Sequence, residues 1–286
     1  MKDIGDGIAD LLGQVRPDVD RADYDTTVAA EIRGGLAAFE FEPFFQPIVS
    51  LVDGRVVGFE ALARWRSAER GLIPPIEFVG AAEANGLIRA IDMVILERAW
   101  RALDAALDAC PYPELNALLS VNLSAEHFLD SAIVDKVRAL LAEGRGRSSR
   151  LQLEITETLL INNTENAEQI LGQLKALGAS IALDDFGTGY SSLVYLHRFP
   201  IDCLKIDRSF SSLIARSDRS RAIVRSIITL AQSMGLRTVA EGVEEREVAD
   251  ELITLGCQYG QGTRFGHPVP ASRLPELLER ARVLAS

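Results

Sequence analysis

The segment LQLEITETLLINNTENAEQILGQLKALGASIALDDF, residues 151–186, contains two short apolar runs with a longer helix-like run between them. LQLEITE and SIALDDF have the length and composition of strands in a covered sheet, whereas AEQILGQLKALG repeats its apolar residues with helical spacing and ends on Gly178. A strand, a helix and a second strand in this order predict that the two strands pair in parallel. This unit decides the fold, because most of the chain repeats it.

Six further strand-like segments surround this unit: PFFQPIV (43–49), VVGFEAL (56–62), LLSVNLS (118–124), CLKID (203–207), RTVAEGV (237–243) and the weaker QYGQG (258–262). Helical patterns occupy residues 88–107, 127–144, 220–235 and 246–256. Strand-like segments that alternate with helices in this number predict an α/β fold, an irregular TIM (β/α)8 barrel. Only VDGR, residues 52–55, joins the first two strands, so the first strand should run antiparallel to the second.

The start of the chain differs from the rest, because it has one helix-like run near residues 25–39 and no strand pattern. We therefore expect two parts, a partly helical N-terminal extension over residues 1–33 and a barrel domain over residues 34–286. No linker rich in proline or serine interrupts the barrel.

Composition excludes several classes of protein. The formal charge of -11 argues against a nucleic-acid polymer as partner, because such binding needs a basic surface. No apolar run approaches the roughly 18 residues of a membrane span, and the N-terminus MKDIGDGIADLL lacks the basic residues of a signal peptide. We expect a cytoplasmic chain with no membrane segment. The three cysteines are scattered, which favours buried thiols over a disulfide framework or a zinc site.

The alternation of side chains along the strands predicts where the polar residues point. In LQLEITE, residues 151, 153 and 155 are apolar and share one face, which must meet the helices, so Glu154 faces the barrel interior. The same alternation along the other strands predicts a set of residues that face the barrel interior: Gly58, Glu60, Leu62, Arg64, Ser120, Asn122, Ala182, Asp184, Cys203, Lys205, Asp207, Val239 and Glu241. The polar members gather at the carboxyl ends of the strands, which is where TIM barrels carry their active sites.

Several carboxylates at one barrel mouth predict bound cations, because they could not otherwise all stay ionised. Oxygen ligands from Glu, Asp and Asn suit hard ions such as Mg2+ or Mn2+ better than zinc. Asp184 and Asp185, where a strand gives way to a loop, could serve two ions at once.

Taken singly, these residues have structural interpretations that stay open. Asp185 could cap a helix, Lys205 and Asp207 could form an ion pair, and Glu241 could favour the start of the next helix. Gln46 before a proline is common at a strand edge. The three histidines, His127, His197 and His267, have no acidic context in the sequence and suit surface or capping positions.

Six motifs in order resemble the EAL-domain family of bacterial cyclic-di-GMP phosphodiesterases: FEALARW (59–65), SVNLS (120–124), LEITE (153–157), LDDFGTGYSSL (183–193), LKIDRSF (204–210) and VAEGVE (239–244). The resemblance extends from Phe41 to Leu278 and includes the tripeptide Glu60-Ala61-Leu62. It implies an EAL phosphodiesterase domain over residues 34–286 that uses two divalent cations, Mg2+ or Mn2+, in second-messenger signalling. Cyclic-di-GMP would be hydrolysed to linear pGpG by in-line attack of water.

The resemblance also implies roles for single residues. The implied metal ligands are Glu60, Asn122, Glu154, Asp184, Asp185 and Glu241, with Asp184 shared between the two ions and Glu241 a further ligand or a base. The implied catalytic residues are Glu60, Lys205, Glu241 and Glu157, of which Lys205 would orient the attacking water and Glu157 would hold the loop 185–192. The implied substrate contacts are Gln46, Arg64, Asp207 and Gln261.

One departure from the family pattern lies beside the last strand, where Thr263 and Arg264 replace residues that are usually aromatic or apolar. It affects the expected affinity more than the chemistry. Two alternative functions are a catalytically inactive cyclic-di-GMP receptor that acts through protein partners, and an unrelated metal-dependent barrel hydrolase. The receptor is disfavoured because the acids and Lys205 are all present. The resemblance further implies a homodimer.

Overall fold

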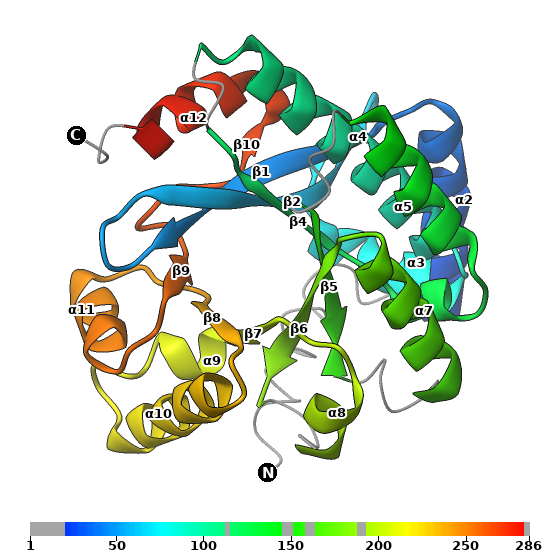
Figure 1. Cartoon of the computed structure of the whole chain (residues 1–286). Coiled ribbons are helices and arrows are strands. Elements are labelled where there is room, and N and C mark those ends of the chain that lie inside the picture. Colours follow the sequence, from blue (N-terminus) through cyan, green and yellow to red (C-terminus); the bar gives the residue numbers. More distant parts are fainter. Residues whose placement is uncertain (1–20, 112–114, 145–150, 158–163, 188–192, 283–286) are drawn as a thin grey trace.

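Eight strands close into a barrel in the computed structural model, which describes residues 21–111, 115–144, 151–157, 164–187 and 193–282 (Figure 1). The barrel strands are β1 Phe41–Ser50, β2 Val56–Ser67, β4 Leu118–Asn122, β5 Leu151–Thr156, β6 Ser180–Phe186, β7 Cys203–Ile206, β8 Arg237–Ala240 and β9 Tyr259–Gln261. All eight correspond to strand-like segments of the sequence. The predicted irregular TIM barrel is confirmed.

The irregularity lies at the first strand, as predicted. The barrel strands pair in parallel in the order β2, β4, β5, β6, β7, β8 and β9, whereas β1 runs antiparallel to both β2 and β9. Its register places Gln46 opposite Glu60, and Ile48 opposite Gln261. Two short strands that the sequence did not predict, β3 Gly71–Ile73 and β10 Val269–Pro270, extend the sheet beside β2 and β1. They are too short to show an alternating pattern.

The helices surround the barrel (Figure 1). They are α2 Arg21–Ala37, α3 Val79–Ala84, α4 Ile88–Ala109, α5 Ala132–Glu143, α7 Thr164–Ala176, α8 Leu193–Arg198, α9 Arg208–Ser211, α10 Asp218–Ser233, α11 Arg246–Thr254 and α12 Leu274–Arg282, with 3-10 helices at Pro75–Glu77, Ala125–Phe128 and Ala271–Arg273. The predicted helical runs correspond to α4, α5, α7, α10 and α11. Gly178 and Gly235 follow their helices with φ of 93° and 70°, the left-handed conformation expected there, whereas Gly144 after α5 has φ -75°.

Two apolar layers position the site. The larger lies between the sheet and the helices and takes the outward residues of the strands, such as Leu153 and Ile155 on β5. The smaller lies inside the barrel and consists of Ile48, Ala182, Cys203 and Val239. The inner layer shares the barrel interior with buried polar side chains such as Ser120 and Gln152.

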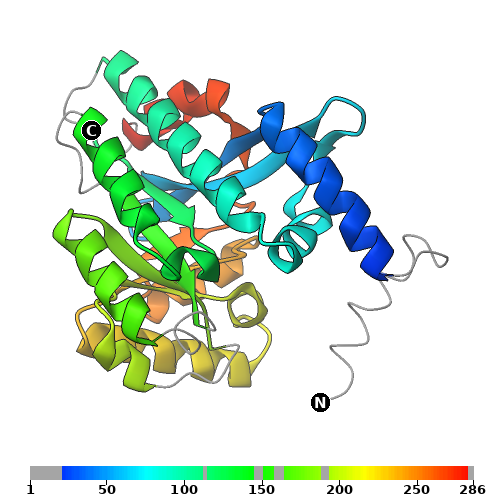
Figure 2. The same ribbon diagram turned by 90° about the vertical axis from the view of Figure 1, so that its right-hand side faces the viewer.

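Helix α2 crosses the expected boundary between the two parts of the chain. Val28, Ala29 and Ile32 on this helix are 3%, 1% and 0% exposed, and Val28 and Ile32 belong to the main core cluster. Figure 2 shows α2 along the side of the barrel, near α3. The division of the chain at residue 33 stays a prediction, and the packing of α2 gives a way to test it.

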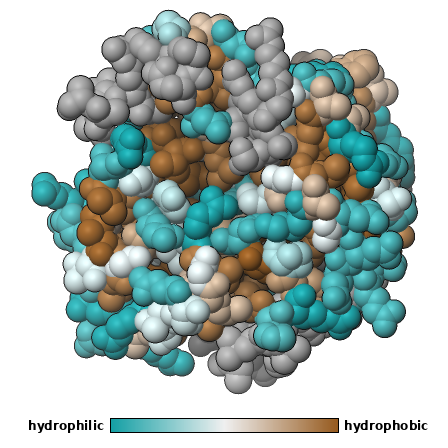
Figure 3. Space-filling model, viewed as in Figure 1, coloured by the Kyte–Doolittle hydropathy of each residue, from teal (hydrophilic) through white to brown (hydrophobic). Residues whose placement is uncertain are grey.

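The described surface is mixed. In Figure 3, hydrophilic and hydrophobic residues are interspersed over the visible face. Within the described ranges, no helix combines the length and the apolar character needed to cross a bilayer. Cys203 and Cys257 are buried, as the sequence predicted, and burial raises the pKa of the Cys203 thiol to about 12. Cys110, at the end of α4, is only partly buried.

Candidate active site

Lys205 on β7 lies at the centre of a group of carboxylates at the carboxyl ends of the strands. Its Nζ lies 2.6 Å from Glu154 Oε2, 2.5 Å from Glu241 Oε1, 3.3 Å from Asp184 Oδ2 and 3.7 Å from Glu60 Oε2. The side chain is 1% exposed. Burial alone would lower the pKa of Lys205, but the surrounding carboxylates raise it well above its ordinary value, so the ammonium is charged.

Glu154 on β5 is held from two sides. Ser120 on β4 donates a hydrogen bond of 2.5 Å to Glu154 Oε1, and Lys205 donates one of 2.6 Å to Oε2. Burial and the nearby Glu60 carboxylate raise the pKa of Glu154 well above its ordinary value, although Lys205 opposes this shift. Glu154 therefore takes up a proton more readily than an ordinary glutamate, and nearby positive charge opposes this.

Glu60 on β2 is held by two amides. Asn122 Nδ2 donates to its Oε1 at 2.8 Å, and Gln261 Nε2 donates to its Oε2 at 2.6 Å. Burial alone would raise the pKa of Glu60, but the Lys205 charge and these hydrogen bonds outweigh burial and bring the pKa below its ordinary value. Glu60 is thus an anion beside a carboxyl group that favours its proton.

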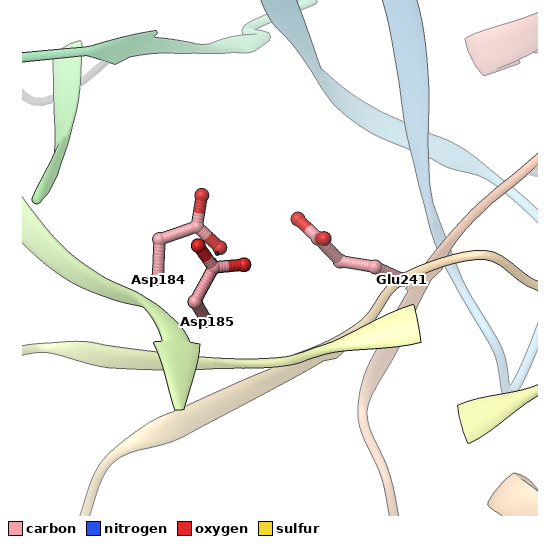
Figure 4. Close-up of side chains that lie close together, drawn as sticks. All are labelled: Asp184, Asp185 and Glu241. Atoms are coloured by element: carbon pink, nitrogen blue, oxygen red, sulfur yellow. Dashed lines mark hydrogen bonds between the residues drawn. The ribbon is translucent and has the colours of Figure 1, made fainter. Parts of the chain in front are cut away.

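Asp184, Asp185 and Glu241 form a second acidic group at the same mouth. Oxygen atoms of the three lie within 4.8 Å of one another, and Figure 4 shows Glu241 pointing across toward the two aspartates. Asp185 has φ 55°, an uncommon conformation for a residue with a side chain. Burial, then the Asp184 carboxylate, raises the pKa of Asp185, and burial raises that of Glu241 to about 8.

The composition of these two groups fits divalent cations. Four carboxyl groups, those of Glu60, Glu154, Asp184 and Glu241, surround the Lys205 ammonium, and the Asp185 carboxyl lies beside those of Asp184 and Glu241. Every potential ligand is an oxygen, including the amide oxygen of Asn122, and this donor set suits Mg2+ or Mn2+. The structure thus brings together all six residues that the sequence predicted as metal ligands. Their role as ligands stays a prediction.

The predicted substrate residues lie around this centre. Gln46 on β1 accepts a hydrogen bond of 3.1 Å from Gln261 Nε2, which also contacts Glu60. Arg64 lies on the same strand as Glu60, with its guanidinium 5.6 Å from the centre of the Phe44 ring, and burial lowers its pKa. Their contacts with substrate stay predictions.

Asp207 lies in a position where it caps a helix. Its Oδ1 accepts hydrogen bonds from Ser209 N at 3.0 Å and from the Ser209 hydroxyl, at the start of α9. This capping role is compatible with a substrate contact through the other oxygen. Lys205 pairs with the four carboxylates rather than with Asp207, so the ion pair that the sequence left open is not formed.

Glu157 follows β5 and is 5% exposed. Strand alternation predicts that it points away from Glu154, toward the loop that follows β6. Residues 188–192 of that loop lie outside the described residues, so the predicted contact of Glu157 with the loop 185–192 stays a prediction. The helix-capping alternative for Asp185 concerns the same loop.

One expectation about the histidines is wrong. His127 is 0% exposed, and its Nε2 lies 3.2 Å from Asp92 Oδ2. Asp92 lies on α4, far from His127 in sequence, so only the packing of α4 against the end of β4 brings the acid near the imidazole. The sequence predicted that Ser120 faces the barrel interior, but it did not predict the hydrogen bonds of Ser120 with Glu154 and Gln152.

Comparison with known proteins identifies the family. A profile of the EAL domain matches residues 29–268. The chain belongs to the EAL-domain family. Cyclic di-GMP phosphodiesterase NbdA of Pseudomonas aeruginosa is 40% identical over 262 residues, which are 92% of this chain and 33% of NbdA. Cyclic di-GMP phosphodiesterase PdeR of Escherichia coli is 40% identical over 229 residues, which are 79% of this chain and 34% of PdeR. This EAL domain therefore spans about a third of the length of these curated relatives.

Solved structures of EAL domains agree in fold. The PaMucR phosphodiesterase in complex with c-di-GMP has a TM-score of 0.80 and 39% identity, covering 87% of this chain and 99% of that one. The EAL enzyme Bd1971, with cAMP and cyclic-di-GMP bound, has a TM-score of 0.85 and 34% identity, covering 95% of this chain and 74% of that one.

Proposed function

We propose that this EAL domain hydrolyses cyclic-di-GMP to linear pGpG with the help of two divalent cations, Mg2+ or Mn2+. The observation that carries the proposal is the convergence of four carboxyl groups on Lys205 at the mouth of the barrel, with Asp185 beside Asp184 and Glu241 as a fifth acid. Relatives with 40% identity are named cyclic di-GMP phosphodiesterases, and PaMucR has been solved with c-di-GMP bound. An inactive receptor is not favoured, because every acid of the set is present.

The residues suit in-line displacement at phosphorus, in which a water oxygen bonds to phosphorus and the ribose 3′ oxygen leaves. Cations bound among Glu60, Asn122, Glu154, Asp184, Asp185 and Glu241 would polarise the phosphate and favour ionisation of water. Lys205 carries a fixed positive charge at the centre of the carboxylates, where it would orient the water and offset developing negative charge.

Substrate binding would use the residues at the edge of this centre. Arg64 supplies a half-buried cation for a phosphate, and its position over Phe44 limits its freedom before binding. The amides of Gln46 and Gln261 are held by each other and by Glu60, so they are oriented before the substrate arrives. Asp207 would complete the groove. Thr263 and Arg264 are exposed beside Gln261 and would alter affinity rather than chemistry.

The test is an assay of the purified protein with cyclic-di-GMP and Mn2+ or Mg2+, followed by chromatography. We expect pGpG as product, no product with EDTA, and a loss of about 100-fold or more in Glu60→Ala. Glu69→Ala, which removes an exposed carboxylate, is the control and should keep full activity. Intact cyclic-di-GMP that binds without being cleaved would instead indicate a receptor, and absence of both binding and product would contradict the proposal.

We also propose that the domain forms a homodimer, as the family resemblance implies, and that it acts in the cytoplasm. Light scattering with and without cyclic-di-GMP tests the oligomeric state. The expected mass is that of two chains of 31.2 kDa, and a mass of one chain under both conditions would contradict it.

A further inference from the structure

A row of hydrogen bonds runs through the barrel interior, from its amino-terminal mouth to Glu154. Arg237 Nη2 donates to Gln152 Oε1 at 3.1 Å, and Gln152 Nε2 donates to Ser120 Oγ at 3.0 Å. The Ser120 hydroxyl then donates to Glu154 Oε1 at 2.5 Å. We propose that Arg237, Gln152 and Ser120 are positioning residues that orient the Glu154 carboxylate for cation binding from the opposite end of the barrel.

The chemistry of the two ends determines the direction of every hydrogen bond in the row. A guanidinium can only donate, so the carbonyl oxygen of Gln152 must face Arg237 and its NH2 group must face Ser120. Ser120 has a single proton, and since its oxygen accepts from Gln152, that proton goes to Glu154. Once Glu154 is ionised, as cation binding requires, its carboxylate can only accept. All three hydrogen bonds therefore run from Arg237 toward Glu154. A substitution that replaces a donor by an acceptor within the row would break it.

The side chains in the middle of the row are buried, so their hydrogen bonds cannot be replaced by hydrogen bonds to water. Ser120 is 0% exposed and Gln152 is 1% exposed, so neither side chain can exchange its partner for bulk water. Strand register supports the row, because Ser120 pairs with Gln152 across β4 and β5. The Ser120 bond fixes one oxygen of Glu154 while Lys205 fixes the other, which leaves the carboxylate a single orientation.

The far end of the row lies at a different surface from the active site. Arg237, Cys203 and Tyr259 are the first residues of their strands, and with Gln152 they line a cavity of about 250 Å3 at the amino-terminal mouth. No substrate at the carboxyl-terminal mouth could contact Arg237. A substitution of Arg237 can therefore affect the active site only through the residues between them. Such an effect would indicate a positioning role and not direct contact with substrate.

The proposal rests on the proposed function, because it takes Glu154 as a cation ligand. The primary readout is the affinity for Mn2+, measured by titration of the metal-free protein. Ser120→Ala should weaken Mn2+ binding about 10- to 100-fold, the range found when partners of metal ligands are removed. Gln152→Leu should weaken it less, and Arg237→Met least, because each lies further along the row. In turnover at saturating Mn2+, kcat should fall while KM for cyclic-di-GMP stays within about twofold.

Gln152→Glu distinguishes the row from simple electrostatics. The change keeps size and shape and adds a negative charge, which by charge alone would strengthen cation binding. In the row it removes the donor to Ser120 and draws the serine proton away from Glu154, so Mn2+ should bind more weakly. This variant also carries the test if Ser120→Ala fails to fold.

Thr238→Val is the matched control. Thr238 is 2% exposed on β8 next to Arg237, and its hydroxyl accepts a hydrogen bond from Gln258 N at 3.3 Å, outside the row. Its loss should reduce thermal stability about as much as Ser120→Ala while Mn2+ affinity stays within about twofold. Unchanged Mn2+ affinity in Ser120→Ala and Gln152→Glu, in a protein that binds Mn2+ and hydrolyses cyclic-di-GMP, overturns the row alone. A wild-type protein that binds no Mn2+ overturns the proposed function and the row with it.

Discussion

Lys205 is the residue on which the electrostatics of the site depend. A buried ammonium is costly to desolvate, and it is tolerated here because four carboxyl groups lie within 3.7 Å of it. The same contact explains how the carboxyl groups coexist in the metal-free protein, with Glu60 ionised and Glu154 favouring its proton. Lys205 alone leaves the site with a net negative charge, which bound cations would neutralise.

Replacing Lys205 by Met should therefore destabilise the metal-free protein. Removing one partner of a buried ion pair leaves the others uncompensated, at a cost of about 3–5 kcal/mol in the free energy of unfolding. Mn2+ should restore part of that loss, because it supplies positive charge among the same oxygens. Urea unfolding with and without Mn2+ measures both effects.

Lys175→Met provides the comparison. Lys175 pairs with Asp202 at 2.5 Å, but its side chain is 33% exposed, so its removal should cost about 1 kcal/mol or less, independent of Mn2+. If the Lys205 variant unfolded like this control, the central role of Lys205 would be wrong.

Affinity for Mn2+ should rise with pH. Burial raises the pKa of Glu241 to about 8, so Glu241 largely carries a proton at neutral pH without bound cations, and burial also raises the pKa of Glu154 well above its ordinary value. A cation binds the ionised carboxylate, so binding must release protons, and the affinity must increase up to about pH 8. Calorimetry in buffers of different ionisation enthalpy counts the protons released.

Glu241→Gln tests the assignment of this pH dependence. It should lower affinity and flatten the part of the profile near pH 8, because the amide has no proton to release. An unaltered slope in this variant would show that another group titrates there.

At the level of strands and helices, the periodicity of apolar residues and the lengths of the connections predicted the features that depend on local sequence. Alternation along β5 and β7 placed Glu154 and Lys205 inside the barrel, and the short turn between β1 and β2 gave their antiparallel pairing. Contacts between segments far apart in the sequence could not be predicted from these local patterns. The burial of His127 beside Asp92 depends on how α4 packs, and the partner of Ser120 depends on register between strands. No sequence period encodes either.

Gly262, directly after β9, shows a constraint that pattern could not reveal. A Cβ at this position would lie 2.1 Å from the carbonyl oxygen and 2.4 Å from the nitrogen of Val243, and backbone atoms cannot move aside as a side chain can. Gly262→Ala should lower the free energy of unfolding by about 3 kcal/mol. It should also weaken Mn2+ binding, because the neighbouring Gln261 holds Glu60. Chemical unfolding and Mn2+ titration measure the two effects.

Gly172→Ala is the control for this substitution. Gly172 lies inside α7, and apart from its chain neighbours and the backbone of its own helix no atom lies within 4 Å of the position that a Cβ would take. Alanine there should stabilise the protein by about 0.5–1 kcal/mol, since glycine is unfavourable inside a helix. Equal effects at the two glycines would contradict the close approach of β9 to Val243.

At the scale of the molecule, closure of the barrel joins the two ends of the EAL domain. β1 pairs with β2, which follows it, and also with β9 and β10, which lie more than two hundred residues later. Gln46 and Gln261 meet only because of this closure. The repeat of strands and helices predicted that the barrel closes, but the start of the folded unit was harder to place, because α2 contributes no strand.

The extent of the folded unit can be tested by truncation. Val28, Ala29 and Ile32 on α2 are buried, and Val28 and Ile32 belong to the main core, so a chain that begins at Gly34 loses them and exposes the residues they cover. Compared with a chain that begins at Arg21, it should lose about 2–4 kcal/mol of stability, since burial of these side chains outweighs the entropy of ordering the helix. Ile32→Ala alone should cost about 2–4 kcal/mol, whereas Glu31→Ala, at an exposed ion pair, should cost less than about 1 kcal/mol. Equal unfolding midpoints for the two chains would instead support an independent N-terminal extension that ends at residue 33.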